Sequence, residues 1–109
     1  MSQESKIDDL RIRLAKAFTW LDIPGVSTEQ LSTLAQRSYR LQSTSNDVEH
    51  SLMCGLTRAA QALGHIQLAP VDYPVHEHIH NLQFGVNTIE SCLKVISPSR
   101  IDAISNDLK

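Results

Sequence analysis

Apolar residues recur with alternating steps of four and three positions over the latter part of the chain. The series consists of Val75, Ile79, Leu82, Val86, Ile89, Leu93 and Ile96. These steps place every member on one stripe of an α-helix, and three uninterrupted heptads are typical of helices that pack along their whole length. This heptad seam predicts a helix of about 23 residues, or roughly 35 Å. The helix is predicted to begin after Pro74 and to end at Ser97, which favours an all-α fold.

Helix signals also precede the heptad seam, whereas the alternation typical of strands is weak throughout. The first helix is predicted from Ser5 to Leu21, because its apolar stripe stops before Pro24 and Gly25. Ser27 and Gln30 can form a capping box at the start of a second helix.

A third helix is predicted to begin with Asn46 as its N-cap and to end at Gly64. The next ten letters, "HIQLAPVDYP", predict a connector, because Pro70 and Pro74 cannot continue a regular helix. This connector is more apolar than an ordinary solvated loop. We therefore expect three of its side chains to pack onto the bundle, namely Ile66, Leu68 and Val71.

A last short helix is predicted after the heptad seam, with Ser97 as its cap and Pro98 at its first position. The predicted fold class is therefore a small all-α bundle of four main helices plus a short C-terminal helix. The length of the chain favours one domain that spans residues 1–109.

The predicted length of the heptad seam exceeds what a lone small bundle can cover, because a compact domain of this size has a radius of gyration of only about 13 Å. Gly55 in mid-helix costs about 1 kcal/mol relative to alanine, and together with Ala59 it leaves one side of the third helix thin. We therefore expect a homodimer in which two copies share a core. Its predicted interface consists of Gly55, Ala59, Leu82, Val86, Ile89 and Leu93.

The charge balance of the chain argues against a dedicated nucleic-acid binder. The formal net charge is −2, whereas such proteins usually carry a strong basic excess. No apolar run has the length of a membrane span, and the opening "MSQESKIDDL" lacks a signal-peptide core. Cys54 and Cys92 both fall in helical patterns and are predicted to be reduced thiols. We expect a cytoplasmic protein with no membrane partner and no cofactor.

The stretch "VHEHIH" matches the HExxH pattern of zinc proteases through His76, Glu77 and His80. His76 and His80 share a helix face, but a catalytic zinc needs a third protein ligand, for which His65 is the best-placed candidate. The motif lies at a helix N-terminus, where the helix dipole disfavours cations. We therefore predict no metal site and no enzyme activity, and a metal-binding protein through His76 and His80 remains an alternative.

Residues 34–52 offer a second alternative, a helix-turn-helix DNA-binding regulator. Arg37, Arg40 and Arg58 could contact phosphates in such a protein. The usual turn glycine is absent, however, and Asp47 and Glu49 would face the DNA. Nucleic-acid binding is therefore the less favoured prediction.

Several large apolar residues fit none of the predicted core stripes. Aromatic side chains of this kind are enriched in protein interfaces. The leading prediction is therefore a small protein–protein interaction module with a regulatory role, which blocks or adapts a partner such as a transcriptional regulator, as anti-activators do. The predicted partner-binding residues are Trp20, Ile66, Leu68, Tyr73 and Phe84.

Overall fold

The computed structural model describes residues 3–23, 25, 27–44 and 47–109, and over these residues it contains helices and connecting turns but no strand. The all-α fold predicted from the sequence is confirmed. A short 3₁₀ turn, η1 (Gln42–Thr44), follows the second of five α-helices. The α-helices are α1 (Gln3–Trp20), α2 (Thr28–Leu41), α3 (Asp47–Leu68), α4 (His76–Leu93) and α5 (Pro98–Leu108).

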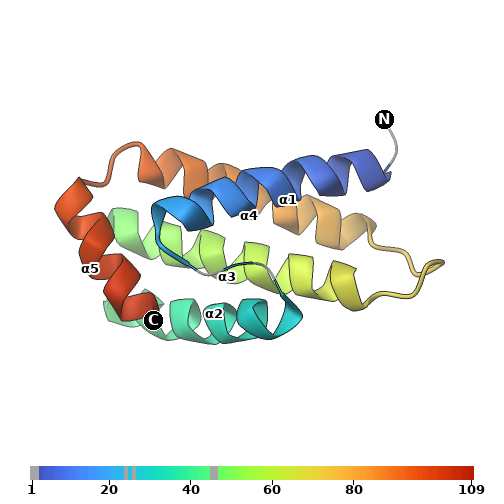
Figure 1. Ribbon diagram of the computed structural model, residues 1–109, viewed down its shortest axis with the longest axis horizontal. Helices are drawn as coiled ribbons and strands as arrows, with labels where there is room; N and C mark the ends of the chain where they lie inside the picture. The colour runs from blue at the N-terminus through green and yellow to red at the C-terminus, as the bar shows by residue number, and fades with distance from the viewer. Residues whose placement is uncertain (1–2, 24, 26, 45–46) are drawn as a thin grey trace.

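Over the described residues, helices α1, α2, α3 and α4 form a bundle and α5 lies across one end of it (Figure 1). Helices α1, α2 and α4 run in the same direction, and α3 runs in the opposite direction against both α2 and α4. α1 packs on α4. The end covered by α5 is the end at which α1 and α4 finish, and the connector between α3 and α4 projects from the other end. The molecule measures 43 × 24 × 22 Å.

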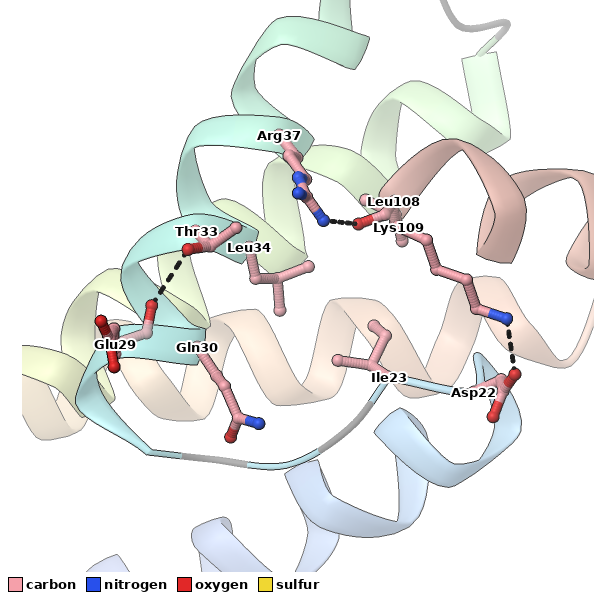
Figure 2. Close-up of a pocket in the computed structure, with 9 residues that line it drawn as sticks. All are labelled: Asp22, Ile23, Glu29, Gln30, Thr33, Leu34, Arg37, Leu108 and Lys109. Atoms are coloured by element: carbon pink, nitrogen blue, oxygen red, sulfur yellow. Dashed lines mark hydrogen bonds and ion pairs between the residues drawn. The ribbon is translucent and has the colours of Figure 1, made fainter.

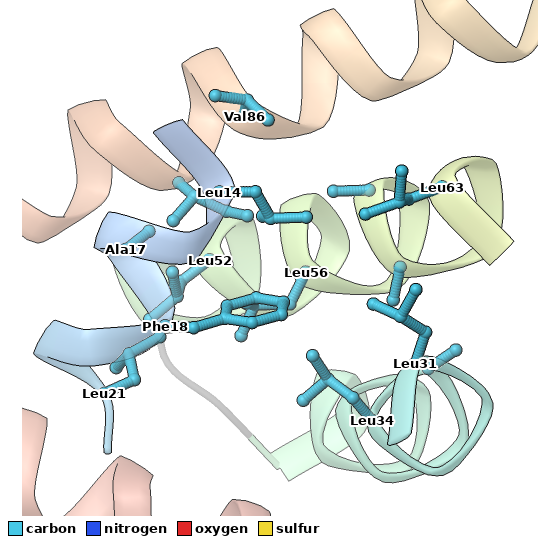
Figure 3. Close-up of a cluster of buried hydrophobic side chains, with 14 of the residues drawn as sticks. Leu14, Ala17, Phe18, Leu21, Leu31, Leu34, Leu52, Leu56, Leu63 and Val86 are labelled. Carbon is cyan, nitrogen blue, oxygen red and sulfur yellow. The ribbon is translucent and has the colours of Figure 1, made fainter. Parts of the chain in front are cut away.

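The core is almost wholly aliphatic, because the chain contains few aromatic residues. Phe18 of α1 is its one large aromatic side chain among the described residues, and it lies among leucines from α2 and α3 (Figure 3). The side chains with almost no exposed surface include Leu14, Leu21, Leu31, Leu52, Leu56, Leu63, Leu82, Val86 and Ile89. Each such side chain contributes about 1.5–3 kcal/mol by leaving water, so the bundle is held mainly by this interior.

Polar contacts tie α5 to the end of the bundle. Ser97 caps the helix by accepting a hydrogen bond from the backbone N–H of Arg100, as the sequence predicts. The Nε of Arg100 donates to Oε2 of the buried Glu49 at 3.3 Å, which joins α5 to α3. At the other end of α5, Nη1 of Arg37 donates to the carbonyl oxygen of Leu108 at 3.0 Å, which joins α5 to α2.

The predicted helix ends are partly confirmed. Ser27 and Gln30 form the predicted capping box of α2, whereas the predicted cap at Asn46 lies outside the described residues. The prediction that α3 ends at Gly64 is wrong, because the helix continues to Leu68. A mid-helix glycine costs only about 1 kcal/mol, and the partly buried Ile66, two residues further on, packs on the core and offsets that cost.

The helix of the heptad seam is shorter than predicted. It ends at Leu93, and the chain then turns through hydrogen bonds from the N–H groups of Val95 and Ile96 to the carbonyl oxygen of Cys92. The turn directs α5 across the end of the bundle. Ile96, the last member of the seam, is therefore partly buried in a turn and does not extend α4.

The residues predicted to form a dimer interface are covered within one chain. Gly55, Ala59, Leu82, Val86 and Ile89 are all buried, and Leu93 is half-buried. Helix α3 covers the seam of α4, and the two helices lie close together where Gly55 meets Gly85. Because α3 covers the heptad seam, the seam no longer supports a homodimer. Self-association stays a prediction, and it would have to use another surface.

Candidate functional site

The five predicted partner-binding residues do not form one surface. Trp20, Leu68, Tyr73 and Phe84 are exposed, but Ile66 packs against the core. Trp20 lies at the end of α1, beside the end of α4. Leu68 and Tyr73 lie before the start of α4, at the opposite end of the bundle (Figure 1). The structure therefore offers two separate apolar surfaces, and Phe84 belongs to neither.

The first surface is the connector tip, which consists of Leu68, Val71 and Tyr73. Their side chains are 70%, 101% and 55% exposed. The prediction that Leu68 and Val71 pack onto the bundle is therefore wrong. Helix α3 carries Leu68 past the last core contacts, and the chain then turns outward. Val71 is absent from the predicted partner-binding residues, although its position between Pro70 and Pro74 is a local signal for an exposed turn.

The connector tip has a defined backbone shape. The N–H of Tyr73 donates to the carbonyl oxygen of Pro70 at 3.0 Å and closes a turn around Val71. Two prolines fix their own φ angles on either side of this turn. The turn therefore holds Val71 out at the end of the molecule.

The charged residues next to the connector tip along the chain are acidic. Asp72 within the turn and Glu77 in the first turn of α4 are both exposed. The sequence from His65 to His80 contains no lysine or arginine. The tip thus combines apolar side chains with neighbouring carboxylates and histidines.

The second surface is the Trp20 groove, a cavity of about 390 Å³ between the C-terminal halves of α1 and α4. Trp20 is 66% exposed at one side of the groove, and Ala17 and Leu93 lie beside it. The remaining lining residues are charged and comprise Arg13, Lys16, Glu90 and Lys94. In α1 the lining residues recur at helical steps of three and four, which was the only local signal for this groove.

The Trp20 groove carries a local excess of positive charge. Arg13 is held in place, because its Nε donates to Oε2 of Glu90 at 3.1 Å and its Nη2 donates to Oδ1 of Asn87 at 2.7 Å. Its hydrogen bond lowers the pKa of the Glu90 carboxyl, and Lys94 lowers that pKa further. Lys16 takes part in none of the ion pairs found within the described ranges. Three cationic side chains therefore stand against one carboxylate.

We expect a Glu90→Gln variant to lose a pH-dependent part of its stability. The pKa of Glu90 is lowered on folding, so the contribution of the Arg13 pair is present above the ordinary value of 4.5 and fades as the pH falls through the lowered folded value. The two side chains are 30% and 38% exposed, so the difference from the parent should be at most about 1 kcal/mol. Urea unfolding at pH 7 and at about pH 3 measures it. A difference that is equally large at both pH values would contradict an ionic contribution.

Phe84 is shielded by a cation. The guanidinium carbon of Arg58 lies 4.6 Å from the centre of the Phe84 ring, at the distance of a cation–π contact. Beside this pair runs a polar depression in which the rings of His65 and His78 stack with centroids 4.9 Å apart. The sequence pattern carries no signal for either pair, because each joins α3 to α4.

The histidines of the HExxH pattern are not gathered around a metal position. His76 and His80 are both exposed on α4, and His65 stacks on His78. In the part of the chain that the structure describes, no three potential ligands lie close enough to hold an ion. The metal-binding alternative therefore lacks a third ligand in this arrangement.

The segment 34–52 does not have the shape of a helix-turn-helix unit. In that motif the two helices cross at about 90–120°, whereas α2 and α3 lie side by side in opposite directions (Figure 1). Arg37 lines a cavity of about 430 Å³ and is directed to the end of α5 (Figure 2). Arg37, one of the three arginines expected to contact phosphates, thus holds the C-terminal helix.

Comparisons with protein families, with curated proteins and with solved structures give no significant match to the chain. None of the helices within the described residues has both the length and the apolar composition to cross a lipid bilayer.

Proposed function

We propose that this chain is a protein–protein interaction module that docks on a partner protein through the connector tip. The observation that carries the proposal is the full exposure of Val71 in a closed turn, with Leu68 and Tyr73 exposed on either side of it. Large apolar side chains that are exposed close together in the chain mark an interaction site more often than single exposed residues do.

The energetics favour binding at this position. Each large side chain of the connector tip gains about 1.5–3 kcal/mol when a partner removes it from water. The turn is already closed, and Pro70 and Pro74 restrict the unbound backbone, so little conformational entropy remains to be lost on binding. A short tip of this kind fits a concave partner better than a flat one.

The charges around the connector tip support a partner of a particular kind. Asp72 and Glu77 fit an apolar pocket with a basic rim, because complementary charges raise the association rate and fix the orientation. An anionic membrane surface attracts lysine and arginine, and the tip has neither. DNA-binding regulators carry a basic surface of the kind that would pair with these carboxylates. We therefore propose a cytoplasmic regulator as the partner, blocked in the manner of an anti-activator, and no catalytic role.

The proposal is tested by removing the apolar side chains of the connector tip. We expect a Leu68→Ser/Val71→Ser double variant to keep its helicity and melting temperature, because both positions are exposed. It should lose the captured partner by more than about tenfold, since a few interface side chains carry most of the binding free energy. The measurement is quantitative affinity capture of the tagged chain from its own cells, followed by titration of the purified partner.

A matched control removes apolar side chains elsewhere on the surface. Ile12 and Val48 are 57% and 40% exposed and lie on α1 and at the start of α3. The Ile12→Ser/Val48→Ser variant should bind the partner as the parent does. Equal binding by the tip variant and the control would show that the docking surface lies elsewhere.

A further inference from the structure

The two apolar surfaces at opposite ends of the molecule have complementary charges. We infer that the connector tip of one copy docks in the Trp20 groove of a second copy, so that the chain associates head to tail. The inference uses the same tip as the proposed function, but it requires no other protein. The strongest observation is that the acidic apolar segment and the basic apolar groove occur on one chain and cannot meet within it.

The apolar parts of the two surfaces match in kind. The groove offers the 66% exposed face of Trp20 with the partly buried Leu93 beside it. The tip offers Val71, which is fully exposed, and the ring of Tyr73. Aromatic rings pack favourably on one another in stacked or edge-to-face arrangements, so Tyr73 and Trp20 form a suitable pair. Docking therefore covers apolar side chains that stay exposed in a single copy.

The charged parts of the two surfaces are opposite in sign. Lys16 and Lys94 flank the groove, and Asp72 and Glu77 flank the tip. Arg13 is already neutralised by Glu90, which leaves the two lysines to meet the two carboxylates. Contacts of this kind between exposed groups set the register and the association rate, and salt screens them.

The positions of the two surfaces decide the form of the assembly. The tip lies where α4 begins and the groove lies where α4 ends, along the 43 Å axis of the molecule. A contact between two different patches is heterologous, so each added copy leaves one tip and one groove open. The association therefore continues beyond a dimer as the concentration rises. It also competes with the proposed partner, because both use the tip.

The test uses one variant for each surface. Trp20→Ala removes the groove aromatic and leaves the tip, whereas Leu68→Ser/Val71→Ser removes the tip and leaves the groove. We expect the parent chain to show a mass that increases with concentration past the dimer in sedimentation velocity. Each variant alone should remain a monomer, and an equimolar mixture should give a one-to-one dimer and nothing larger, because only one intact contact can form.

Fluorescence gives a second readout of the same mixture. Trp20 is the only tryptophan of the chain, so under tryptophan-selective excitation the Trp20→Ala variant is silent and all emission comes from the groove of the tip variant. Adding the silent chain should shift this emission to shorter wavelength in a saturable way, and added salt should weaken the effect. An Ile12→Ser chain, altered at an exposed position outside both surfaces, should assemble as the parent does.

Three results would each overturn the inference. They are a parent chain that stays monomeric at millimolar concentration, a parent that stops at a symmetric dimer, and a mixture of variants that does not dimerise. None of them affects the proposed function, whose partner depends on the tip alone. Conversely, head-to-tail assembly without tip-dependent capture of a partner would contradict the proposed function and leave the inference in place.

Discussion

A Gly85→Ala substitution should destabilise the chain by about 1–3 kcal/mol, because it adds a side chain to a tightly packed contact. A Cβ atom at Gly85 would lie 2.8 Å from the Cβ and the backbone nitrogen of Ala59, and equally close to the carbonyl oxygen of Gly55. Two of these three atoms belong to the backbone of α3 and cannot move aside as a flexible side chain would. The helices α3 and α4 would have to separate along the line where they bury the heptad seam.

Gly64→Ala provides the matched control on α3. A Cβ atom there would meet nothing within 4 Å, so the change should stabilise the chain by about 0.5–1 kcal/mol through helix propensity. Urea denaturation of the two variants and the parent at one temperature measures both effects. If Gly85→Ala were as stable as Gly64→Ala, the close contact between α3 and α4 would be absent in solution.

Ile89→Asp should unfold the chain. Ile89 has no exposed surface, and an unpaired carboxylate at such a position costs several kcal/mol or more, which approaches the total stability of a domain of this size. Circular dichroism should show loss of most helical signal at 25 °C. Because the seam is buried within one chain, the loss should not depend on protein concentration.

The same variant separates the two explanations of the heptad seam. A seam that faced a second copy would give a folded monomer after the substitution, whereas a seam covered by α3 gives an unfolded chain. Ser91→Asp places the same charge at an exposed position of α4 and should change stability by no more than about 0.5 kcal/mol. A folded, monomeric Ile89→Asp variant would restore the dimer interface predicted from the sequence.

The helices were predictable because their signals are local. The heptad seam, the capping box of Ser27 and Gln30, and the cap at Ser97 each depend on residues a few positions apart. The helix that covers the heptad seam was not predictable from such local signals. The sequence shows Gly55 and its small neighbour Ala59, but it does not show that Gly85 lies opposite them, 30 positions along the chain. The dimer was inferred from a surface that the neighbouring helix covers.

The candidate surfaces were predicted only in part, for a related reason. Trp20, Leu68 and Tyr73 stand out in the sequence because they fit no core stripe, and the structure exposes them. The hydrophobic pattern alone does not show whether an apolar connector packs on the bundle or projects from it. Leu68 is therefore predicted both to pack onto the bundle and to bind a partner. The Trp20 groove joins α1 to α4, and its Arg13–Glu90 pair spans 77 positions, which no local pattern reveals.

The parallel course of α1 and α4 has a consequence for how the chain acquires its structure during synthesis. Helix α1 leaves the ribosome before α2 and α3, and α4, the helix on which it packs, follows only after them. Contacts between distant positions form late, because the loop between them must first be closed. The hairpin of α3 and α4 closes over a short connector and can form early, whereas the α1 side chains that pack on α4 stay uncovered until α1 docks on it. Until then, these side chains are the part of the nascent chain most open to chaperones and to aggregation.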